Sequence, residues 1–241
     1  MARIFEVDYR NSINDRYGQV ATNVNTAKLV RTEKGNAADF LASATNCFTY
    51  GATTNLTTSF TISVAVKVNA AVGTIYGLIS KGGISGVAPA GQENWAIYID
   101  STPQIRFRSD STGTNGFFAT FSDFQNGWHL WQFTKSGTTG TFYRDGVAQT
   151  TTAGTAFGSY TNTSTLAVGA RAAAGTLPVT GNILWARIHN SALTQQEINK
   201  EYEDFLHSFQ SGKSRSPLYY PKPTDLSKEA SIVCAYNMIP K

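Results

Sequence analysis

The sequence predicts an all-β protein, a sandwich or barrel of roughly a dozen short strands with one late helix. Apolar and polar residues alternate over many short segments, most cleanly over residues 59–68. Turn signals separate these segments, and Asp145-Gly146 is a strong one because both positions of a two-residue hairpin turn need positive φ. Of the 241 residues, 12% are aromatic and 15% are charged, which suits a buried core with polar turns.

In the first third of the chain we expect strands at residues 3–9, 38–41, 47–50, 59–68 and 75–80, and a polar loop over residues 11–25. The run 59–68 places apolar side chains on one face: Phe60, Ile62, Val64, Val66 and Val68. Its other face carries small or polar residues and is weakly apolar or solvent-facing: Ser59, Thr61, Ser63, Ala65 and Lys67. This strand is therefore expected to bury one side only.

A hairpin follows, with strands over residues 93–100 and 104–109 joined by residues 101–103. Its apolar positions are Trp95, Ile97, Ile99, Ile105 and Phe107, and its polar or small positions are Asn94, Ala96, Tyr98, Asp100, Arg106 and Arg108. Further strands are expected at residues 116–121, 128–135, 141–144, 147–151 and 165–169. Each has a turn signal beside it, as expected for antiparallel neighbours.

The stretch 181–202 reads as a closing strand, a turn and a capped helix. Residues 183–188 alternate only weakly and end at the turn residues Asn190 and Ser191. Thr194 precedes Glu197 at the spacing of a capping box, in which each side chain bonds the other's backbone N–H. One face of the helix is apolar, with Ile198, Tyr202, Phe205 and Phe209.

The composition changes after Phe209. Residues 210–228 are polar and contain three prolines, so this segment is expected to be an extended arm rather than a helix. Residues 230–239 look like a strand again. We expect two regions, a folded domain over residues 1–209 and an arm over residues 210–241 whose strand docks on its own sheet edge or on a neighbouring subunit.

Three segments, in this order, match the pattern of a known superfamily: Trp128-His-Leu-Trp-Gln-Phe-Thr, Phe142-Tyr-Arg-Asp-Gly, and Gly181-x-Ile with Arg187-Ile-His-Asn-x-Ala-Leu. Together they resemble laminin G-like domains of the concanavalin A-like lectin/glucanase superfamily. The resemblance covers the chain up to about the end of the late helix. It implies a two-sheet antiparallel jelly roll with one short C-terminal helix that plugs an open end of the sandwich. These motifs are scaffold motifs, so they point to a fold more than to an activity.

The residues give little support to catalysis or to a metal. Leu184 and Trp185 stand where members of the family often carry acids, which weakens any calcium role implied there by the resemblance. No cofactor is expected, and calcium stays an alternative that no motif supports. The related glucanases carry three closely spaced acids on one strand; Glu6 and Asp8 have that spacing, but a third acid does not follow. Glu93 and Asp100 are too far apart to share a strand face. We therefore expect a protein that is not an enzyme.

The three histidines and two cysteines are expected to be structural. His129, His189 and His207 lack metal-ligand spacing and triad partners in the sequence, which favours packing or surface roles. Cys47 and Cys234 lie in apolar contexts, so they are either two buried thiols or a pair formed in an oxidising compartment.

The polar face of the hairpin over residues 93–109 is the candidate binding site. Its members are Asn94, Tyr98, Asp100, Arg106 and Arg108. Aromatic rings stack on sugars, while Arg, Asn and Asp form paired hydrogen bonds with them, so Tyr98 with the two arginines would suit an acidic glycan. The alternative is a solvated sheet face with a cross-strand ion pair, such as Asp100 with an arginine.

The charge and the pattern of apolar residues limit the classes of partner that the chain is expected to have. The net charge is +4 without a dense run of Lys or Arg, so a nucleic-acid partner is not expected. A membrane partner is not expected either, because apolar runs of spanning length and a secretory signal are lacking. With the Thr/Ala/Gly/Asn-rich composition, this suggests a virion, in particular a phage structural or receptor-binding protein that adheres to glycans or to neighbouring subunits through residues 211–241. The alternatives are a cytoplasmic location, a glycoside hydrolase or its ancillary carbohydrate-binding domain, and a purely structural virion decoration protein.

Overall fold

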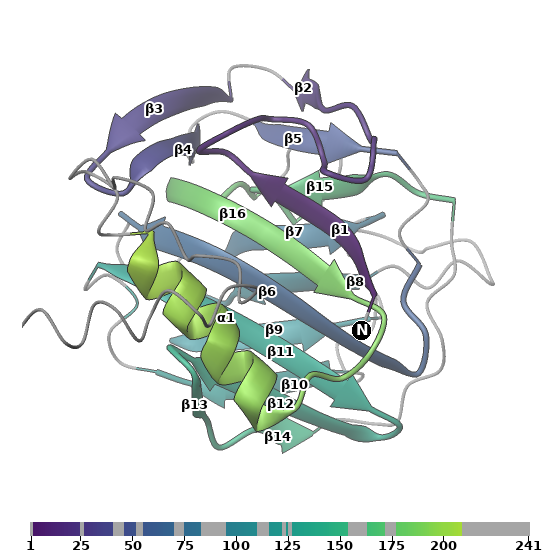
Figure 1. Cartoon of the computed structure of the whole chain (residues 1–241). Coiled ribbons are helices and arrows are strands. Elements are labelled where there is room, and N and C mark those ends of the chain that lie inside the picture. The colour runs from purple at the N-terminus through teal and green to yellow at the C-terminus, as the bar shows by residue number, and fades with distance from the viewer. Residues whose placement is uncertain are drawn as a thin grey trace, which may run out of the picture.

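Two antiparallel sheets of eight strands each, with one helix, form a sandwich (Figure 1). This architecture, taken from a computed structural model, confirms the expected all-β jelly-roll class. The structure describes residues 2–24, 27–40, 46–51, 55–69, 75–82, 95–109, 116–121, 124, 127–153, 163–171 and 177–208. Phe209, the arm over residues 210–241, Cys234 and Asn94 therefore lie outside the described residues.

Sheet A carries the longest strands. Its order is β13 (Val147–Ala148), β12 (Thr139–Arg144), β11 (Trp128–Ser136), β6 (Ser59–Val68), β16 (Gly181–His189), β4 (Gly35–Phe40) and β3 (Lys28–Thr32), and β1 (Arg3–Asp8) also pairs with β16. Strand β4 pairs with residues 181–183 of β16, whereas β1 pairs with residues 185–189. Both edges of β16 are thus occupied, because β6 lies along the other one.

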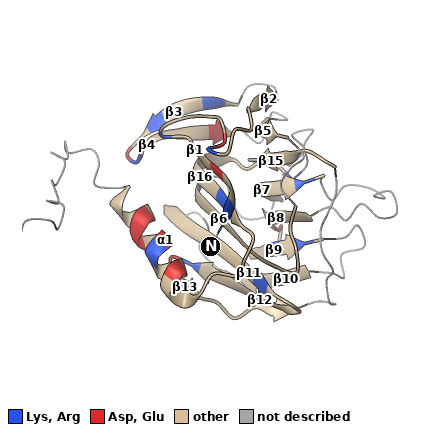
Figure 2. Ribbon diagram, turned by 45° about the vertical axis from the view of Figure 1, so that its right-hand side comes forward, with Lys and Arg blue, Asp and Glu red and all other residues tan. Residues whose placement is uncertain are grey.

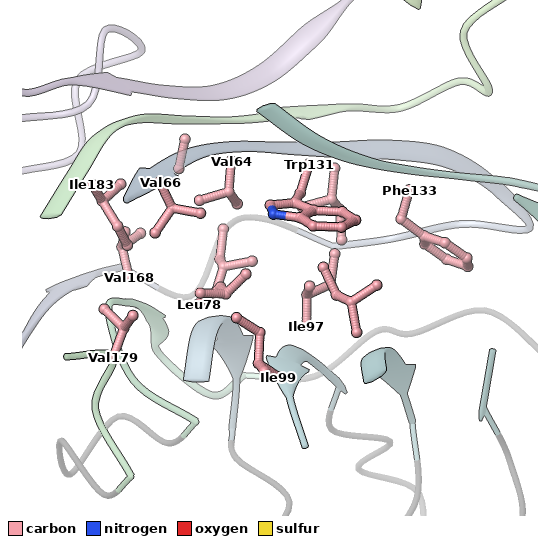
Figure 3. Close-up of a cluster of buried hydrophobic side chains, with 14 of the residues drawn as sticks. Val64, Val66, Leu78, Ile97, Ile99, Trp131, Phe133, Val168, Val179 and Ile183 are labelled. Carbon is pink, nitrogen blue, oxygen red and sulfur yellow. The ribbon is translucent and has the colours of Figure 1, made fainter. Parts of the chain in front are cut away.

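Sheet B faces sheet A across the core. Its order is β14 (Thr152–Ala153), β10 (Gly116–Thr120), β9 (Gln104–Arg108), β8 (Trp95–Ile99), β7 (Tyr76–Lys81), β15 (Leu166–Val168), β5 (Cys47–Tyr50) and β2 (Thr22–Val24). The inward side chains of the two sheets interdigitate, as Figure 3 shows for Val64 and Trp131 from sheet A against Leu78 and Ile97 from sheet B. Phe107 of sheet B stacks on Phe133 of sheet A with ring centroids 4.6 Å apart. Such aromatic contacts between the sheets add to the hydrophobic burial that holds them together.

The helix α1 (Gln195–His207) lies across the outer face of sheet A (Figure 1). Two expectations from the sequence are therefore wrong: the helix does not plug an open end, and the second face of β6 is not solvent-facing. Thr61, Ser63 and Ala65 are fully buried. Phe205 of the helix packs in a cluster with residues of β4, β6, β11 and β16: Ala37, Ala65, Leu130, Leu184 and Trp185. Small residues occupy this face of β6 because a helix must fit against it.

A β-bulge explains why the closing strand alternates weakly. The pairing of β16 with β6 shifts between Ile183 and Trp185, so Leu184 and Trp185 both pack against the helix. An extra residue in a strand inverts its inside-outside alternation beyond that point. The departure of Leu184 and Trp185 from the acidic family pattern thus has a structural cause, the docking of α1.

The capping box of α1 is confirmed. The Glu197 N–H donates to Thr194 Oγ1 at 3.4 Å, and the Glu197 carboxylate accepts from the Thr194 N–H at 2.8 Å. Ile198 and Phe205 are buried as expected, whereas Tyr202 is half-buried. Strands β2 and β3 are not expected from the sequence, and β2 lies within the predicted loop; both are short and mostly exposed, so apolar alternation is lacking.

Candidate functional site

The outer face of strands β8 to β10 carries the predicted site residues. Alternation buries Ile97, Ile105 and Phe107 between the sheets and turns the intervening side chains outward. Tyr98 of β8 lies directly opposite Arg106 of β9, which lies directly opposite Phe118 of β10. The three side chains therefore form one row across the strands, at the cross-strand distance at which side chains interact.

Arg106, at the centre of this row, is held by polar neighbours on its own face. Its Nε lies 2.7 Å from Asp100 Oδ2, and its Nη2 donates to Gln104 Oε1 at 2.6 Å. The guanidinium carbon lies 5.3 Å from the centroid of the Phe118 ring, within the range of a cation–π contact. The cross-strand ion pair that the sequence offered as an alternative is thus present. This ion pair and the hydrogen bond to Gln104 hold the Arg106 guanidinium in one orientation against the Phe118 ring.

Arg171, three residues after β15, lies on the same face and adds a third arginine. The guanidinium carbon of Arg171 lies 4.7 Å above the centroid of the Tyr98 ring. This close approach to β7 is possible because position 77 is glycine: a Cβ there would lie 1.9 Å from the backbone nitrogen of Arg171. The Gly77 N–H also donates to the Leu177 carbonyl at 2.8 Å, so Leu177 lies beside β7 as well.

The structure brings together four of the five predicted site residues. Tyr98, Asp100, Arg106 and Arg108 share this face, while Asn94 lies outside the described residues. Tyr98 is only 2% exposed, so it supports Arg171 rather than offering a ring to a ligand. Sequence reasoning missed Phe118 and Arg171. The alternation of residues 116–121 would have shown that Phe118 shares a face with Arg106, whereas nothing local in the sequence places Arg171 there.

A second polar cluster is buried beneath α1, centred on Glu201. Its carboxylate accepts from Ser63 Oγ at 2.6 Å and from Gln132 Nε2 at 3.1 Å, and lies 2.9 Å from His189 Nε2. Arg187 Nη1 lies 3.5 Å away. Burial alone would raise the pKa of Glu201, but the hydrogen bond from His189, the charge of Arg187 and the other bonds outweigh it and lower the pKa to about 2.

Two arginines and two glutamates close this cluster. Arg187 Nε donates to Glu6 Oε1 at 3.1 Å, and Arg3 Nη1 lies 2.7 Å from Glu6 Oε2. Arg3 also reaches Glu201 at 3.6 Å, so each arginine contacts both carboxylates. Glu6 and Glu201 belong to a charge-balanced structural cluster that joins β1, β16 and α1. Sequence reasoning missed it because its members come from β1, β6, β11, β16 and α1, which only the fold brings together.

His129 also has a carboxylate partner that its sequence neighbours do not reveal. Its Nδ1 lies 2.7 Å from Asp145 Oδ2, and its Nε2 lies 2.9 Å from Arg144 Nη2. Asp145 Oδ1 accepts the Leu130 N–H at 2.9 Å, which ties the hairpin turn to β11. These contacts give His129 a structural role at the turn.

Two solvent-open depressions of about 340 Å³ each flank the N-terminal loop. Acidic residues line the first, but Asp8 pairs with Arg10, and Asp15 accepts the backbone N–H groups of Glu6 and Tyr17. Within the described ranges, no group of three or more His, Cys, Asp and Glu residues has the geometry to hold a metal ion. A helix long and apolar enough to cross a membrane is likewise absent from the described part of the chain.

Comparison with known families identifies the domain. The model of the Laminin_G_3 family, described as concanavalin A-like lectin/glucanases superfamily, matches residues 42–199. The match begins before β5 and ends within α1, so it includes the hairpin that carries the candidate face. The sequence matches none of the curated proteins with which it was compared.

Solved structures share the fold at low sequence identity. The binding domain of Paraclostridial Mosquitocidal Protein 1 has a TM-score of 0.66 and 14% identity, over 84% of this chain and 52% of that one. The Botulinum Neurotoxin Type G receptor binding domain has a TM-score of 0.63 and 15% identity, over 85% and 52%. Domain 4 of AbnA, a GH43 extracellular arabinanase from Geobacillus stearothermophilus, in complex with arabinotriose, has a TM-score of 0.57 and 16% identity, over 82% and 97%. The chain thus spans about half the length of the first two.

Proposed function

The chain belongs to the concanavalin A-like lectin/glucanase superfamily, and from this premise we propose that it is a non-catalytic, lectin-like module that binds a glycan on the outer face of β8 to β10. The row Tyr98–Arg106–Phe118 is the observation that carries the proposal. It combines a half-buried aromatic ring with a fixed guanidinium fork, the two elements that hold the apolar face and the hydroxyl groups of a sugar.

The candidate face is already organised for a ligand. Asp100 and Gln104 hold Arg106 against Phe118, so ordering this long side chain costs little when a sugar binds. The β-strand backbone holds the residues in register, and a rigid element positions a site more accurately than a loop does.

The same face would also serve an ancillary carbohydrate-binding domain of a glycan-active enzyme. The similarity to Domain 4 of the arabinanase favours this second candidate, because this chain covers 97% of that domain. Hydrolysis by the chain itself has less support. A glycosidase needs an acid and a second carboxylate free to act on the sugar, and the buried pair Glu6 and Glu201 is engaged with Arg3 and Arg187.

A glycan array probed with the labelled full chain tests the proposal. Wild type is expected to bind a defined set of glycans, and Arg106→Gln and Phe118→Ala are each expected to weaken that binding at least about tenfold. Arg31→Gln is the matched control, since Arg31 is an exposed arginine on β3 of the opposite sheet. Unchanged binding in both face variants, or no bound glycan, would contradict the proposal. New reducing ends produced from a bound glycan would favour the hydrolase instead.

We also propose that the module belongs to a virion, as a phage structural or receptor-binding protein. The support is compositional: the chain is rich in Thr, Ala, Gly and Asn, and its segment 210–228 is polar and contains prolines. A purely structural decoration protein is the alternative, in which the face contacts neighbouring virion proteins. Mass spectrometry of purified particles would place the chain in the virion or outside it. Removing residues 211–241 and measuring the mass in solution would test whether the arm assembles subunits.

A further inference from the structure

The second of the two depressions lies beside sheet A, away from the face of β8 to β10. It has a volume of about 340 Å³, at the lower end of the range that small-molecule pockets have. Its lining comes from β1, the loop after β1, the end of β16 and α1. Because β8 to β10 belong to sheet B, a ligand in this depression would occupy a separate site.

Two buried polar atoms at this depression lack hydrogen-bond partners. They are Arg3 Nε and His189 Nδ1, and neither has a partner among the residues that the structure describes. Both residues line the depression, and they lie directly opposite each other in the pairing of β1 with β16, so their side chains share one face. Buried polar groups normally have a partner, so this pair marks a place where a polar group of a ligand would be stabilised.

The two atoms are a donor beside an acceptor. The Nε of Arg3 carries a proton, as it does in every arginine. His189 Nε2 lies 2.9 Å from Glu201 Oε1, and since an ionised carboxylate only accepts, Nε2 carries the ring proton. In the neutral ring Nδ1 is then an acceptor. A hydroxyl group can accept from Arg3 and donate to His189 at the same time, whereas a carboxylate only accepts and an ammonium group only donates.

The rest of the lining suits a neutral sugar. Tyr17 is 52% exposed, and its ring can lie against the apolar face of a sugar. Lys200 and Asp204 are exposed, lie one helical turn apart on α1 and carry opposite charges, which largely offset each other. Figure 2 shows the same mixture along the whole helix, where acidic and basic residues alternate. Such a lining offers hydrogen bonds without a strong preference for an anion or a cation.

We infer that this depression is a second carbohydrate site, in which a hydroxyl group of a neutral sugar bonds with Arg3 and His189, its ring lies against Tyr17, and its other hydroxyl groups bond with Lys200 and Asp204. The inference goes beyond the proposed site on β8 to β10 and does not depend on it. With both sites occupied, the module would hold sugars on two different sheets, so one chain could bind two glycans or two parts of a branched one.

Titration of the full chain with neutral oligosaccharides of hexose or pentose units, followed by ¹⁵N NMR of the histidine side chains, tests the inference. The chain has three histidines, so His189→Gln identifies the resonances of His189. At least one neutral series is expected to saturate and to shift the Nδ1 resonance of His189. The resonances of His129 are the internal control, because both of its ring nitrogens already have protein partners. Affinity is expected to stay the same as salt rises, because binding does not rest on net charge.

The variants Tyr17→Ala and Asp204→Asn are each expected to weaken this binding by about tenfold, since one removes the ring contact and the other removes a charged acceptor. Tyr17→Phe keeps the ring and is expected to keep most of the affinity. Glu203→Gln is the matched control, because Glu203 is exposed on the same helix but does not line the depression. All these positions are exposed, and thermal unfolding of each variant verifies that the fold is intact.

Three results decide between the two sites. Unchanged His189 resonances with every neutral series, or a strong loss of affinity with salt, would overturn the second site. Binding that Arg106→Gln weakens but Tyr17→Ala and Asp204→Asn do not would also overturn it and leave the face of β8 to β10 in place. Binding that Tyr17→Ala weakens while Arg106→Gln and Phe118→Ala do not would support the depression and count against the face.

Discussion

Removing the Glu201 carboxylate should weaken the packing of α1 on sheet A and so destabilise the protein. This single group accepts hydrogen bonds from Ser63 and Gln132 and pairs with His189 and Arg187. Glu201→Ala leaves Arg187 and His189 buried without this counter-ion. We expect the free energy of unfolding to fall by about 3 to 5 kcal/mol, the usual cost of removing one partner of a buried ion pair.

The pKa of Glu201 gives an independent magnitude. A fall from 4.5 to about 2 on folding corresponds to about 3 kcal/mol of stabilisation by the ionised carboxylate. Because the folded pKa is the lower one, this stabilisation is complete above pH 4.5 and is lost as the pH falls to about 2. Glu201→Gln, which cannot ionise, is expected to be less stable than wild type at pH 7 and to approach it in stability near pH 2.

Urea denaturation followed by tryptophan fluorescence measures both effects, since Trp185 lies beneath the helix. Glu203→Ala is the matched control because Glu203 is exposed on the same helix, and we expect it to change stability by no more than about 0.5 kcal/mol. If Glu201→Ala cost no more than Glu203→Ala, or if the stability difference between wild type and Glu201→Gln were independent of pH, the cluster would not hold the helix in the way described.

Three further changes test other parts of the fold. Thr194→Ala removes the helix cap and is expected to cost about 1 kcal/mol by urea denaturation, whereas Gln196→Ala, exposed in the first turn, should be near neutral. Gly77→Ala would place a methyl group against the backbone of Ala170 and Arg171 and should cost at least about 2 kcal/mol, whereas Gly51→Ala meets only an ordinary contact at 3.5 Å. Equal thermal stabilities of the two variants would refute this close approach. Burial lowers the pKa of Lys81 from 10.5 to about 8, so the unfolded state binds more protons between these values and the unfolding free energy of wild type should rise with pH across this window. Lys81→Met should lack that rise, and an identical slope in both proteins would contradict the buried ammonium.

Period-two alternation and turn chemistry predict most of the fold. The strands β6, β8, β9 and β11 are visible in the sequence because each buries alternate apolar side chains, and α1 is visible through its capping box. The sequence does not show where α1 packs, because a strand face of small and hydroxyl residues, such as that of β6, is equally typical of a face exposed to solvent. Only the three-dimensional packing shows that Phe205 and Trp185 cover it.

The candidate face likewise contains residues that the sequence predicts and one that it does not. Tyr98, Asp100, Arg106 and Arg108 follow from the alternation of one hairpin, so the sequence could predict that they share a side. Arg171 reaches that side from the residues just after β15, and its placement depends on chain topology rather than on local pattern. The buried cluster of Glu6 and Glu201 was hidden for the same reason.

The pairing of β1 with β16 also has a consequence for how the chain folds as it is made. Residues 3–8 find their sheet neighbour only when residues 185–189 are present, whereas β6 can pair with β11 before β16 completes its other edge. At ribosomal speeds of about 5 to 20 residues per second, β1 stays without its partner for roughly 10 to 40 seconds after it emerges. A strand whose edges stay unpaired for that long can pair with another chain. We therefore expect slow, late closure of sheet A, and expression temperature and chaperone supply to decide how much of this protein reaches the folded state.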